Sequence, residues 1–321
     1  MKAAVYYETG APDVLRYEDV PDPSIGDQEL LIRVEAISIE GGDTLNRLGG
    51  QMNSVPHIVG YQCAGTVLEA GAGATKAVVG DRVVALGVDG SHAELRAVSD
   101  TFAWKIPDGL STQEAACVPV PFGTADDCLF EFGRLVAGET ALIQAGASGV
   151  GIAAIQMAKR AGARVLATAS SNEKLERLKE YGLDEGINYV DLDFVVETKR
   201  LTDGRGADVI VDTVGATLQG SLSALAYRGR CVTVGEAGRS PAVQLDISNM
   251  RSNNQTLSGY LLATELFFHE RARQMIERLL QEVTEGALRV VIDRTFPLAE
   301  AAAAHAYIEG RRAFGRVLLI P

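Results

Sequence analysis

The chain of 321 residues has few cysteines, and none of them stands close to another. The four, Cys63, Cys117, Cys128 and Cys231, include no Cys-x-x-Cys pair. Structural zinc sites usually draw closely spaced thiolates onto one ion, so this spacing argues against a structural zinc lobe. We expect the four thiols to be small buried apolar side chains in a reducing compartment. A site assembled from distant cysteines and histidines stays open at this stage.

The chain also lacks an excess of basic residues, a signal-peptide core and any long apolar run. It carries 30 Lys and Arg against 42 Asp and Glu, a formal net charge of −12. This charge repels nucleic acid, and no local basic patch offsets it. No apolar run approaches the roughly 18 residues that a membrane-spanning helix requires. We therefore expect a cytoplasmic protein that binds neither nucleic acid nor a membrane.

The hydrophobic pattern divides the chain, which is long enough for two domains, into two parts. Up to about residue 120, short strand-like runs bounded by glycines predict a small β-rich, barrel-like domain. Beyond it, buried strands alternate with helices, which is typical of βαβ units and a parallel sheet. The expected strands of the first part include 30–37, 63–70 and 81–86, and those of the second part are 140–144, 164–169, 207–212 and 230–234, with helices at 150–161 and 173–181.

The last sixty residues contain two further helix patterns and two strand patterns. Helices are expected at 270–285 and 298–309, and strands at 289–292 and 315–320. A single strand has unpaired backbone groups along both edges. We therefore expect the strand at 315–320 to pair back into the first domain.

A glycine-rich segment, Ala-Gly-Ala-Ser-Gly-Val-Gly at 145–151, lies between an expected buried strand and an expected helix. In this context glycines allow a sharp turn and let a pyrophosphate approach the backbone amides. The helix N-terminus adds free N–H groups and partial positive charge. The segment predicts a dinucleotide site, with a plain glycine-rich turn as the alternative. The expected contacts are Gly146, Ala147, Ser148, Gly149, Val150 and Gly151.

The end of the second expected strand indicates which dinucleotide binds. NAD sites usually carry an acidic residue there for the ribose 2′-hydroxyl, whereas this chain has Ser170 and, shortly after it, Lys174. Hydroxyl and ammonium groups are suited to a 2′-phosphate, so we expect NADPH. Two alternatives stay open: Ser170 and Glu173 also read as a capping box of the following helix, and an inward-turned Glu173 would favour NAD.

Taken together, the motifs resemble those of the zinc-independent, ζ-crystallin-like quinone oxidoreductases of the medium-chain dehydrogenase/reductase superfamily. The resemblance runs nearly end to end. It rests on the glycine-rich turn and on Met-Lys-Ala-Ala-Val at 1–5, Gly-Asp-Arg-Val at 80–83, Gly-Thr-Ala at 123–125, Asp-Thr-Val-Gly at 212–215 and Gly-Arg-Val at 315–317.

This resemblance implies an α/β fold with a GroES-like catalytic domain at 1–120 and 262–321. A doubly wound Rossmann domain would occupy 121–261. It further implies that Lys174 and Tyr189 contact the 2′-phosphate, and that Thr124 and Gly235 lie at the nicotinamide end. The alternative for Tyr189 is a core aromatic. Residues 257–261 resemble the strand through which Rossmann domains of this superfamily form homodimers.

The departures from zinc-dependent relatives bear on mechanism. Those enzymes carry a cysteine where this chain has Glu40, and Gly-His-Glu where it has Gly60-Tyr61-Gln62. Carboxylate, phenol and amide groups there do not supply the thiolate and imidazole ligands of a catalytic zinc, so we expect no metal. The quinone reductases usually show Asn at the position of Glu40 and a tyrosine near Gly50, and both are absent here.

Three residues are candidates for a catalytic role: Tyr61, Glu40 and Thr124. Tyr61 is the first candidate for proton donor, with a partly buried aromatic as its alternative and bulk water as an alternative acid. Glu40 would bond to the nicotinamide side or the substrate, or else pair with Arg47 or Arg82. The four histidines show no ligand spacing, so we expect surface or core roles for them.

The predicted reaction is hydride delivery from NADPH to a quinone or to the β-carbon of an α,β-unsaturated carbonyl, both electrophilic without a Lewis acid. Two alternatives remain. One is an enoyl-thioester reductase, against which the acidic balance of the chain argues weakly. The other is a nucleotide-binding protein with little turnover, which the missing Asn and Tyr keep open.

Overall fold

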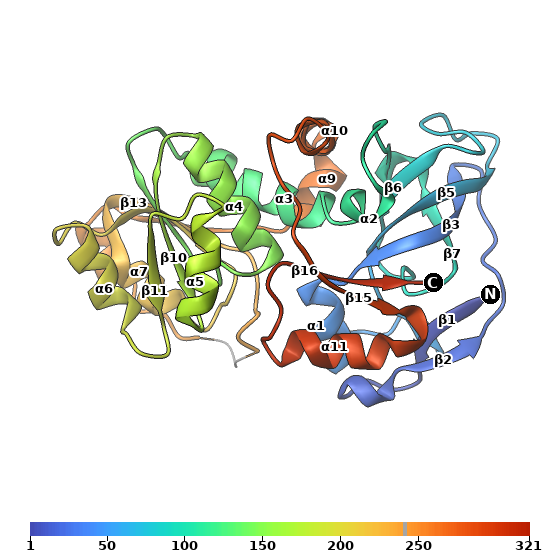
Figure 1. The fold of residues 1–321 in the computed structure, drawn as a ribbon, viewed down its shortest axis with the longest axis horizontal. Coiled ribbons are helices and arrows are strands. Elements are labelled where there is room, and N and C mark those ends of the chain that lie inside the picture. Colours follow the sequence, from blue (N-terminus) through green and yellow to red (C-terminus); the bar gives the residue numbers. More distant parts are fainter. Residues whose placement is uncertain (240–242) are drawn as a thin grey trace. The chain divides into compact units, whose positions relative to one another are not determined.

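Residues 1–239 and 243–321 are described by the computed structural model shown in Figure 1. The chain forms two units, of which the first joins Met1–Val120 to Leu266–Pro321 and the second is Pro121–Glu265. The sequence predicts the second boundary after residue 261, whereas it falls after Glu265. Among the described residues, no helix is long and apolar enough to cross a membrane.

The first unit is built on a seven-stranded sheet. Along the sheet the order is β15-β16-β3-β5-β6-β8, and β7 also pairs with β3. Buried aliphatic side chains such as Leu30, Ile32 and Val83 form one of its cores. The strands are β3 Glu29–Ser38, β5 Gln62–Ala70, β6 Arg82–Leu86, β7 Leu95–Ser99, β8 Ala103–Lys105, β15 Ile292–Pro297 and β16 Arg316–Ile320, and a smaller sheet contains β1 Lys2–Tyr6, β2 Arg16–Asp19 and β4 His57–Ile58.

The strand β16 confirms that the distant end of the sequence returns to the first unit. It pairs antiparallel with β3, where Leu318 lies opposite Ser38, and parallel with β15. The strand predicted at 289–292 is wrong, because β15 begins only at Ile292. Its partner begins at Arg316, just after Gly315 with a φ of 96°, so the residues before Ile292 have no strand to pair with.

The helices of the first unit agree with their apolar periodicity. In α10, Glu270–Thr284, the residues Met275, Leu279 and Val283 are among those buried along one stripe. The helix predicted at 298–309 begins as a 3₁₀ turn, Leu298–Glu300, and continues as α11, Ala301–Glu309. The others are α1 Gly41–Gly49 and α2 Thr112–Ala115, while α3 Pro119–Asp126 and α9 Leu262–Phe268 span the unit boundaries.

The second unit contains a six-stranded parallel sheet, ordered β11-β10-β9-β12-β13-β14. The chain runs outward from β9 on one side and then from β12 on the other, so the direction of winding reverses between these two strands. This confirms the predicted doubly wound α/β fold. The strands are β9 Thr140–Ile143, β10 Arg164–Ala169, β11 Glu185–Asn188, β12 Ala207–Asp212, β13 Leu225–Thr233 and β14 Thr256–Gly259.

Helices connect these strands as expected of βαβ units. The predicted helix at 150–161 is α4, Gly149–Arg160, and that at 173–181 is α5, Asn172–Lys179. A short π-helix, Asp127–Phe132, continues α3. The remaining helices are α6 Phe194–Leu201, α7 Leu218–Ala224 and α8 Ser248–Ser252.

Candidate functional site

The glycine-rich turn joins the end of β9 to the start of α4. Ser148 is the N-cap of α4, and its hydroxyl accepts a hydrogen bond of 3.0 Å from the amide of Gly151. A side chain at Gly151 would place its Cβ 2.5 Å from the carbonyl oxygen of Ala145, and one at Gly146 would lie 2.8 Å from Cβ of Ala167. These two positions therefore require glycine for steric reasons.

The turn leaves two amides available at the positive end of α4. The N–H groups of Gly149 and Val150 make no hydrogen bond within the part of the chain that the structure describes. The first turn of this 12-residue helix contains no acidic residue. Free amides and the helix dipole together favour an anion such as a pyrophosphate.

The predicted 2′-phosphate contacts gather where β10 and β11 end. Ser170 follows β10, and the amide of Tyr189, just after β11, donates to the carbonyl of Ala169 at 3.1 Å. Tyr189 is 40% exposed, so its alternative role as a core aromatic is wrong. Lys174 lies in the first turn of α5 and is half-buried. Their contact with a phosphate stays a prediction.

The capping box predicted from Ser170 and Glu173 does not form, because the N-cap of α5 is Ser171 and the residue three positions on is Lys174. Ser171 caps α5, because its hydroxyl accepts a 3.3 Å hydrogen bond from the amide of Lys174. The hydroxyl of Ser170 makes no hydrogen bond with any described residue. Ser170 is therefore available for a ligand.

The predicted nicotinamide-end residues of the second unit are Gly235 and Thr124. Gly235 follows β13 and packs against a neighbouring turn, since a Cβ on it would lie 2.9 Å from the carbonyl oxygen of Thr213. Thr124 lies in α3 and is 5% exposed. Neither role is tested by this arrangement, and both stay predictions.

Glu40 lies in a buried polar cluster of the first unit. Its side chain is 4% exposed, and its Oε1 accepts hydrogen bonds from Gln62 at 3.0 Å and Ser38 at 3.3 Å. It also forms a close ion pair with Arg316. The predicted partners, Arg47 and Arg82, are wrong. The pairing of β16 with β3 brings Arg316 to Glu40 from 276 residues away.

The two arginines expected near Glu40 are engaged elsewhere. Arg47 is fully buried and pairs with Glu309 on α11. Arg82 donates to the carbonyl of Leu110 at 2.8 Å and to the hydroxyl of Thr112 at 3.1 Å. Of these three arginines, Arg316 is therefore the one that supplies the countercharge of Glu40.

Burial shapes the acidity of the two carboxyl groups around the start of α1. It raises the pKa of Glu40 to about 7 even though Arg316 opposes the shift. It raises the pKa of Asp43 to about 8, although the Asp43 carboxylate accepts a 2.9 Å hydrogen bond from the backbone amide of Glu40. The other oxygen, Oδ1 of Asp43, has no hydrogen-bond partner among the described residues.

Tyr61 places its hydroxyl against the first turn of α1. A Cβ on Gly42 would lie 2.4 Å from Oη of Tyr61, so a glycine at this position makes room for the phenol. Burial, with the negative charges of Asp43 and Glu40, raises the pKa of Tyr61 well above its usual value. The phenol therefore stays protonated at neutral pH and is a hydrogen-bond donor.

The comparisons with known proteins agree with this architecture. Residues 26–108 match the alcohol dehydrogenase GroES-like domain family, and residues 149–285 match the zinc-binding dehydrogenase family. A quinone oxidoreductase from Pseudomonas aeruginosa is 33% identical over 320 residues, which is 97% of both chains. The chain belongs to the quinone oxidoreductase family of the medium-chain dehydrogenase/reductase superfamily. It is accordingly an oxidoreductase.

Two further relatives refine this placement in the family. A 2-haloacrylate reductase from a Burkholderia species is 32% identical, covering 99% of this chain and 98% of the other. The structure of the Escherichia coli quinone oxidoreductase complexed with NADPH has a TM-score of 0.95, is 26% identical and is covered completely by this chain. Family members thus include reductases named for quinones and for an activated alkene.

The residues of this chain at the positions of the zinc ligands are engaged with other groups of the first unit. Gln62 uses both ends of its amide, because Nε2 donates to Glu40 at 3.0 Å and Oε1 accepts from the amide of Val120 at 2.8 Å. Glu40 is paired with Arg316. Neither residue type provides the thiolate and imidazole ligands that a catalytic zinc takes in this superfamily's zinc enzymes.

Two histidines that the sequence leaves unconnected meet inside the first unit. His92 and His305 are both fully buried, and their Nε2 atoms lie 3.0 Å apart. Arg47 donates from Nε to Nδ1 of His305 at 3.4 Å. With this tautomer, His305 donates from Nε2 to Nε2 of His92. The two residues are 213 positions apart, and no local spacing signals their pairing.

Acid is expected to destabilise the fold through His92. Burial, with a smaller contribution from Arg96, lowers the pKa of His92 from 6.5 to about 3. Between these two values the unfolded chain binds a proton that the folded chain does not. The free energy of unfolding therefore falls by about 1.4 kcal/mol for each pH unit below the unfolded pKa. Above that pKa, the stabilising contribution of the neutral His92 is fully present.

Urea unfolding measured between about pH 5 and pH 8 checks this expectation. A His92→Gln variant should be less stable near neutral pH but lose stability more slowly on acidification. His269, which is exposed, provides the matched control: His269→Gln should keep the parental slope. A His92→Gln slope equal to that of the parent would contradict the assignment.

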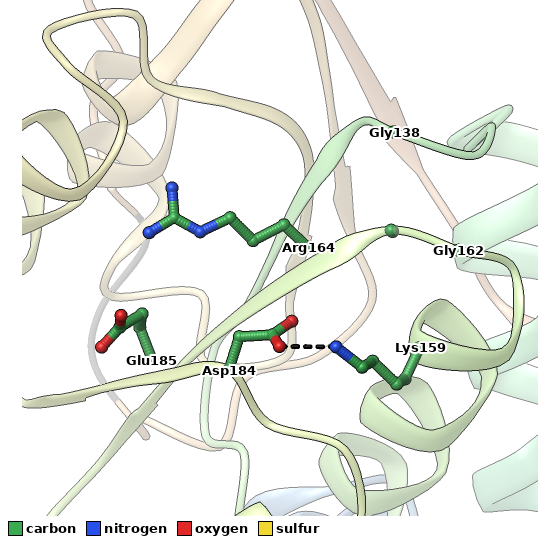
Figure 2. Close-up of a pocket in the computed structure, with 7 residues that line it drawn as sticks. Gly138, Lys159, Gly162, Arg164, Asp184 and Glu185 are labelled. Carbon is green, nitrogen blue, oxygen red and sulfur yellow. Dashed lines mark hydrogen bonds and ion pairs between the residues drawn. The ribbon is translucent and has the colours of Figure 1, made fainter.

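A depression lies at the amino ends of the strands of the second unit's sheet, opposite the glycine-rich turn. It is lined by residues at the amino ends of β10 and β11, and Figure 2 shows Lys159 paired with Asp184 across it. Arg164 also donates to the carbonyl of Leu201 at 2.6 Å. Ligands of doubly wound sheets bind at the carboxyl ends of the strands, so this depression is not the dinucleotide site.

Proposed function

We propose that the chain is an NADPH-dependent, zinc-independent reductase whose acceptor is a quinone or an α,β-unsaturated carbonyl. The observation that carries the proposal is the turn at 145–151, where two sterically required glycines and the free amides of Gly149 and Val150 form an anion site on α4. Family membership supports it, as does the NADPH bound in the similar Escherichia coli quinone oxidoreductase.

The residues present fit NADPH better than NADH. The amides of Gly149 and Val150 would hold the pyrophosphate, with Ser148 fixing the turn. At the end of β10 the available hydroxyl of Ser170, with Lys174 and Tyr189, would hold the 2′-phosphate. No acidic side chain stands at Ser170, where a carboxylate would repel that phosphate. When bound, the nicotinamide supplies a hydride from its C4.

Within this proposal Tyr61 donates a hydrogen bond and then a proton to the acceptor oxygen. Its raised pKa keeps the proton on the phenol until negative charge develops on the substrate. Glu40 is a positioning residue, because Gln62, Ser38 and Arg316 occupy its Oε1. Thr124 and Gly235 would contact the nicotinamide end.

The edge strand β14 supports a homodimer as part of this proposal. It pairs with β13 on one side, and no other described strand pairs with its outer edge. An exposed edge of this kind is a template for pairing with a second copy of the sheet. We propose a cytoplasmic homodimer assembled through β14.

The test of this function is NADPH and NADH oxidation with four acceptors: 1,4-benzoquinone, 9,10-phenanthrenequinone, a 2-enal and a crotonyl thioester. We expect NADPH to be used faster than NADH, and the quinones or the enal to be reduced. Faster use of NADH would refute the role of Lys174, and preference for the thioester would assign the enzyme to that class instead. Tight NADPH binding without turnover on all four would refute the reductase.

A Tyr61→Phe variant should reduce the 2-enal about 100-fold more slowly, since positioned general acids contribute about 10²–10⁴-fold. NADPH affinity should stay at the parental value, because the change removes only the hydroxyl. Tyr7 of the same unit, 45% exposed, gives the matched control Tyr7→Phe, which should behave as the parent does. An unchanged enal rate in Tyr61→Phe would show that water is the acid.

A further inference from the structure

A continuous chain of buried hydrogen bonds crosses the carboxyl ends of the three central strands of the second unit. The amide of Ala145 donates to Oγ1 of Thr168 at 3.1 Å, and Thr168 donates to Oε1 of Gln144 at 2.7 Å. The side-chain Nε2 of Gln144 then donates to Oγ of Ser221 at 3.2 Å. Ser221 finally donates to Oδ2 of Asp212 at 2.7 Å. The chain thus links β10, β9, α7 and β12.

The direction of this chain is determined at both ends. At one end Oδ2 of Asp212 accepts from the hydroxyl of Ser221, and at the other the backbone N–H of Ala145 can only donate. Gln144, Thr168 and Ser221 are at most 1% exposed, so no solvent replaces a missing link. In such surroundings the bonds polarise one another, and a broken link leaves an unpaired polar group.

One end of this chain of hydrogen bonds holds the start of the glycine-rich turn. Thr168 accepts from two consecutive amides, that of Ala145 with its hydroxyl and that of Gly146 with its backbone carbonyl at 2.8 Å. Ala145 has a φ of 52°, a left-handed conformation that a residue with a Cβ adopts only when its surroundings impose it. Thr168 therefore fixes the geometry in which the turn presents its amides.

The other end holds a second turn. Oδ1 of Asp212 accepts hydrogen bonds from the amides of Val214 at 2.9 Å and Gly215 at 3.0 Å, and the carboxylate also accepts from the hydroxyl of Thr217. A side chain on Gly235 would meet this same turn at Thr213. Under the proposed function, the turn at 145–151 meets the pyrophosphate and that at 213–217 lies toward the nicotinamide end.

We propose that Gln144 and Ser221 are positioning residues that couple these two turns, so that both ends of the dinucleotide are bound as one event. The inference rests on the proposed function, because it takes NADPH as the ligand that spans both turns. Neither side chain reaches the surface, so neither touches the cofactor. Their effect passes through Thr168 on one side and Asp212 on the other.

The first test replaces Ser221, the link on α7, and compares it with a serine of the same helix. Ser221→Ala should raise the Kd of NADPH about tenfold, as loss of one buried hydrogen bond implies, with kcat at saturating NADPH within about twofold of the parent. Among the described residues, Ser223 donates only to the carbonyl of Gln219, at 3.0 Å within α7. The control Ser223→Ala should therefore leave the Kd unchanged.

The second test is a double-mutant cycle between the two ends of the hydrogen-bond chain. Thr168→Val and Thr217→Val each remove a hydroxyl with little change in shape. Their combined effect on the Kd of NADPH should differ from the product of the single effects by about threefold or more, as for coupled sites. In the Ser221→Ala background the two effects should simply multiply.

The outcomes separate the coupling from the proposed function. Two outcomes would overturn the coupling alone. One is a Ser221→Ala enzyme that loses thermal stability but keeps the parental Kd. The other is a parent background in which the effects of Thr168→Val and Thr217→Val on the Kd simply multiply. Failure of the unaltered chain to bind NADPH would overturn the proposed function and the coupling with it. Thermal unfolding of each variant confirms that the Kd is measured on folded protein.

Discussion

Gly151→Ala is expected to weaken NADPH binding by about two orders of magnitude or more, since misplacements of about 1 Å in a binding site can cost 10²-fold. The added Cβ would lie 2.5 Å from the carbonyl oxygen of Ala145 and 2.6 Å from that of Gly146. Both are backbone atoms, so no side-chain rotation relieves the clash. The turn itself must move, and with it the amides of Gly149 and Val150.

Isothermal titration with NADPH measures this effect directly. The matched control is Gly49→Ala at the end of α1, where an added Cβ has nothing within 4 Å. It should bind NADPH as the parent does and unfold at the same temperature or slightly above it. A folded Gly151→Ala protein with parental affinity would refute the assignment of this turn to the pyrophosphate.

Arg316→Met is expected to cost about 3–5 kcal/mol of folding free energy, the range measured when one partner of a buried ion pair is removed. Glu40 and Arg316 are 4% and 9% exposed at their side chains, so water cannot replace the lost guanidinium. The substitution also removes donors to the hydroxyl of Ser38 at 3.0 Å and the carbonyl of Ile39 at 2.7 Å.

The loss should depend on pH in a defined direction. Burial already raises the pKa of Glu40 to about 7, above its usual 4.5. Removing the countercharge raises it further, so in the variant the folded state binds a proton over a wider range than the unfolded state. Stability of Arg316→Met should therefore be best preserved in mild acid and fall as the pH rises through neutrality.

Urea unfolding of three variants at acidic and alkaline pH tests this prediction. The double variant Glu40→Gln with Arg316→Met removes both charges of this pair, so it should recover much of the loss and lose the added pH dependence. Lys179→Met breaks the exposed pair with Glu176 and should cost less than about 1 kcal/mol. A loss in Arg316→Met equal at all pH values would refute a buried, titrating Glu40.

The second unit was largely predictable from the sequence, because its signals are local. The central strands are rich in Val, Ile, Leu and Ala, and the glycine-rich turn stands directly between β9 and α4. A strand of a parallel sheet is buried on both faces, so hydrophobicity alone identifies it. Even there, the helix cap fell on Ser171 rather than Ser170, since two adjacent serines give the same signal.

The polar interior of the first unit was not predictable in the same way. Glu40 pairs with Arg316 and His92 with His305, across 276 and 213 residues. Such pairs are created by strand register and helix docking, which leave no periodic trace in the sequence. The nearer arginines, Arg47 and Arg82, were equally plausible partners by charge and proximity along the chain. The pairing of β16 with β3 places Arg316 beside Glu40 and so decides against both of them.

The position of β16 between β3 and β15 has a consequence for biosynthesis. Arg316 is joined to Ser38 across 278 residues, so the ribosome makes the whole second unit before β3 can gain this neighbour. The second unit has every strand of its sheet within Pro121–Glu265, so it can fold while the sheet of the first unit still lacks β16. Until β16 arrives, Glu40 lacks its countercharge, and the nascent polar cluster is incomplete.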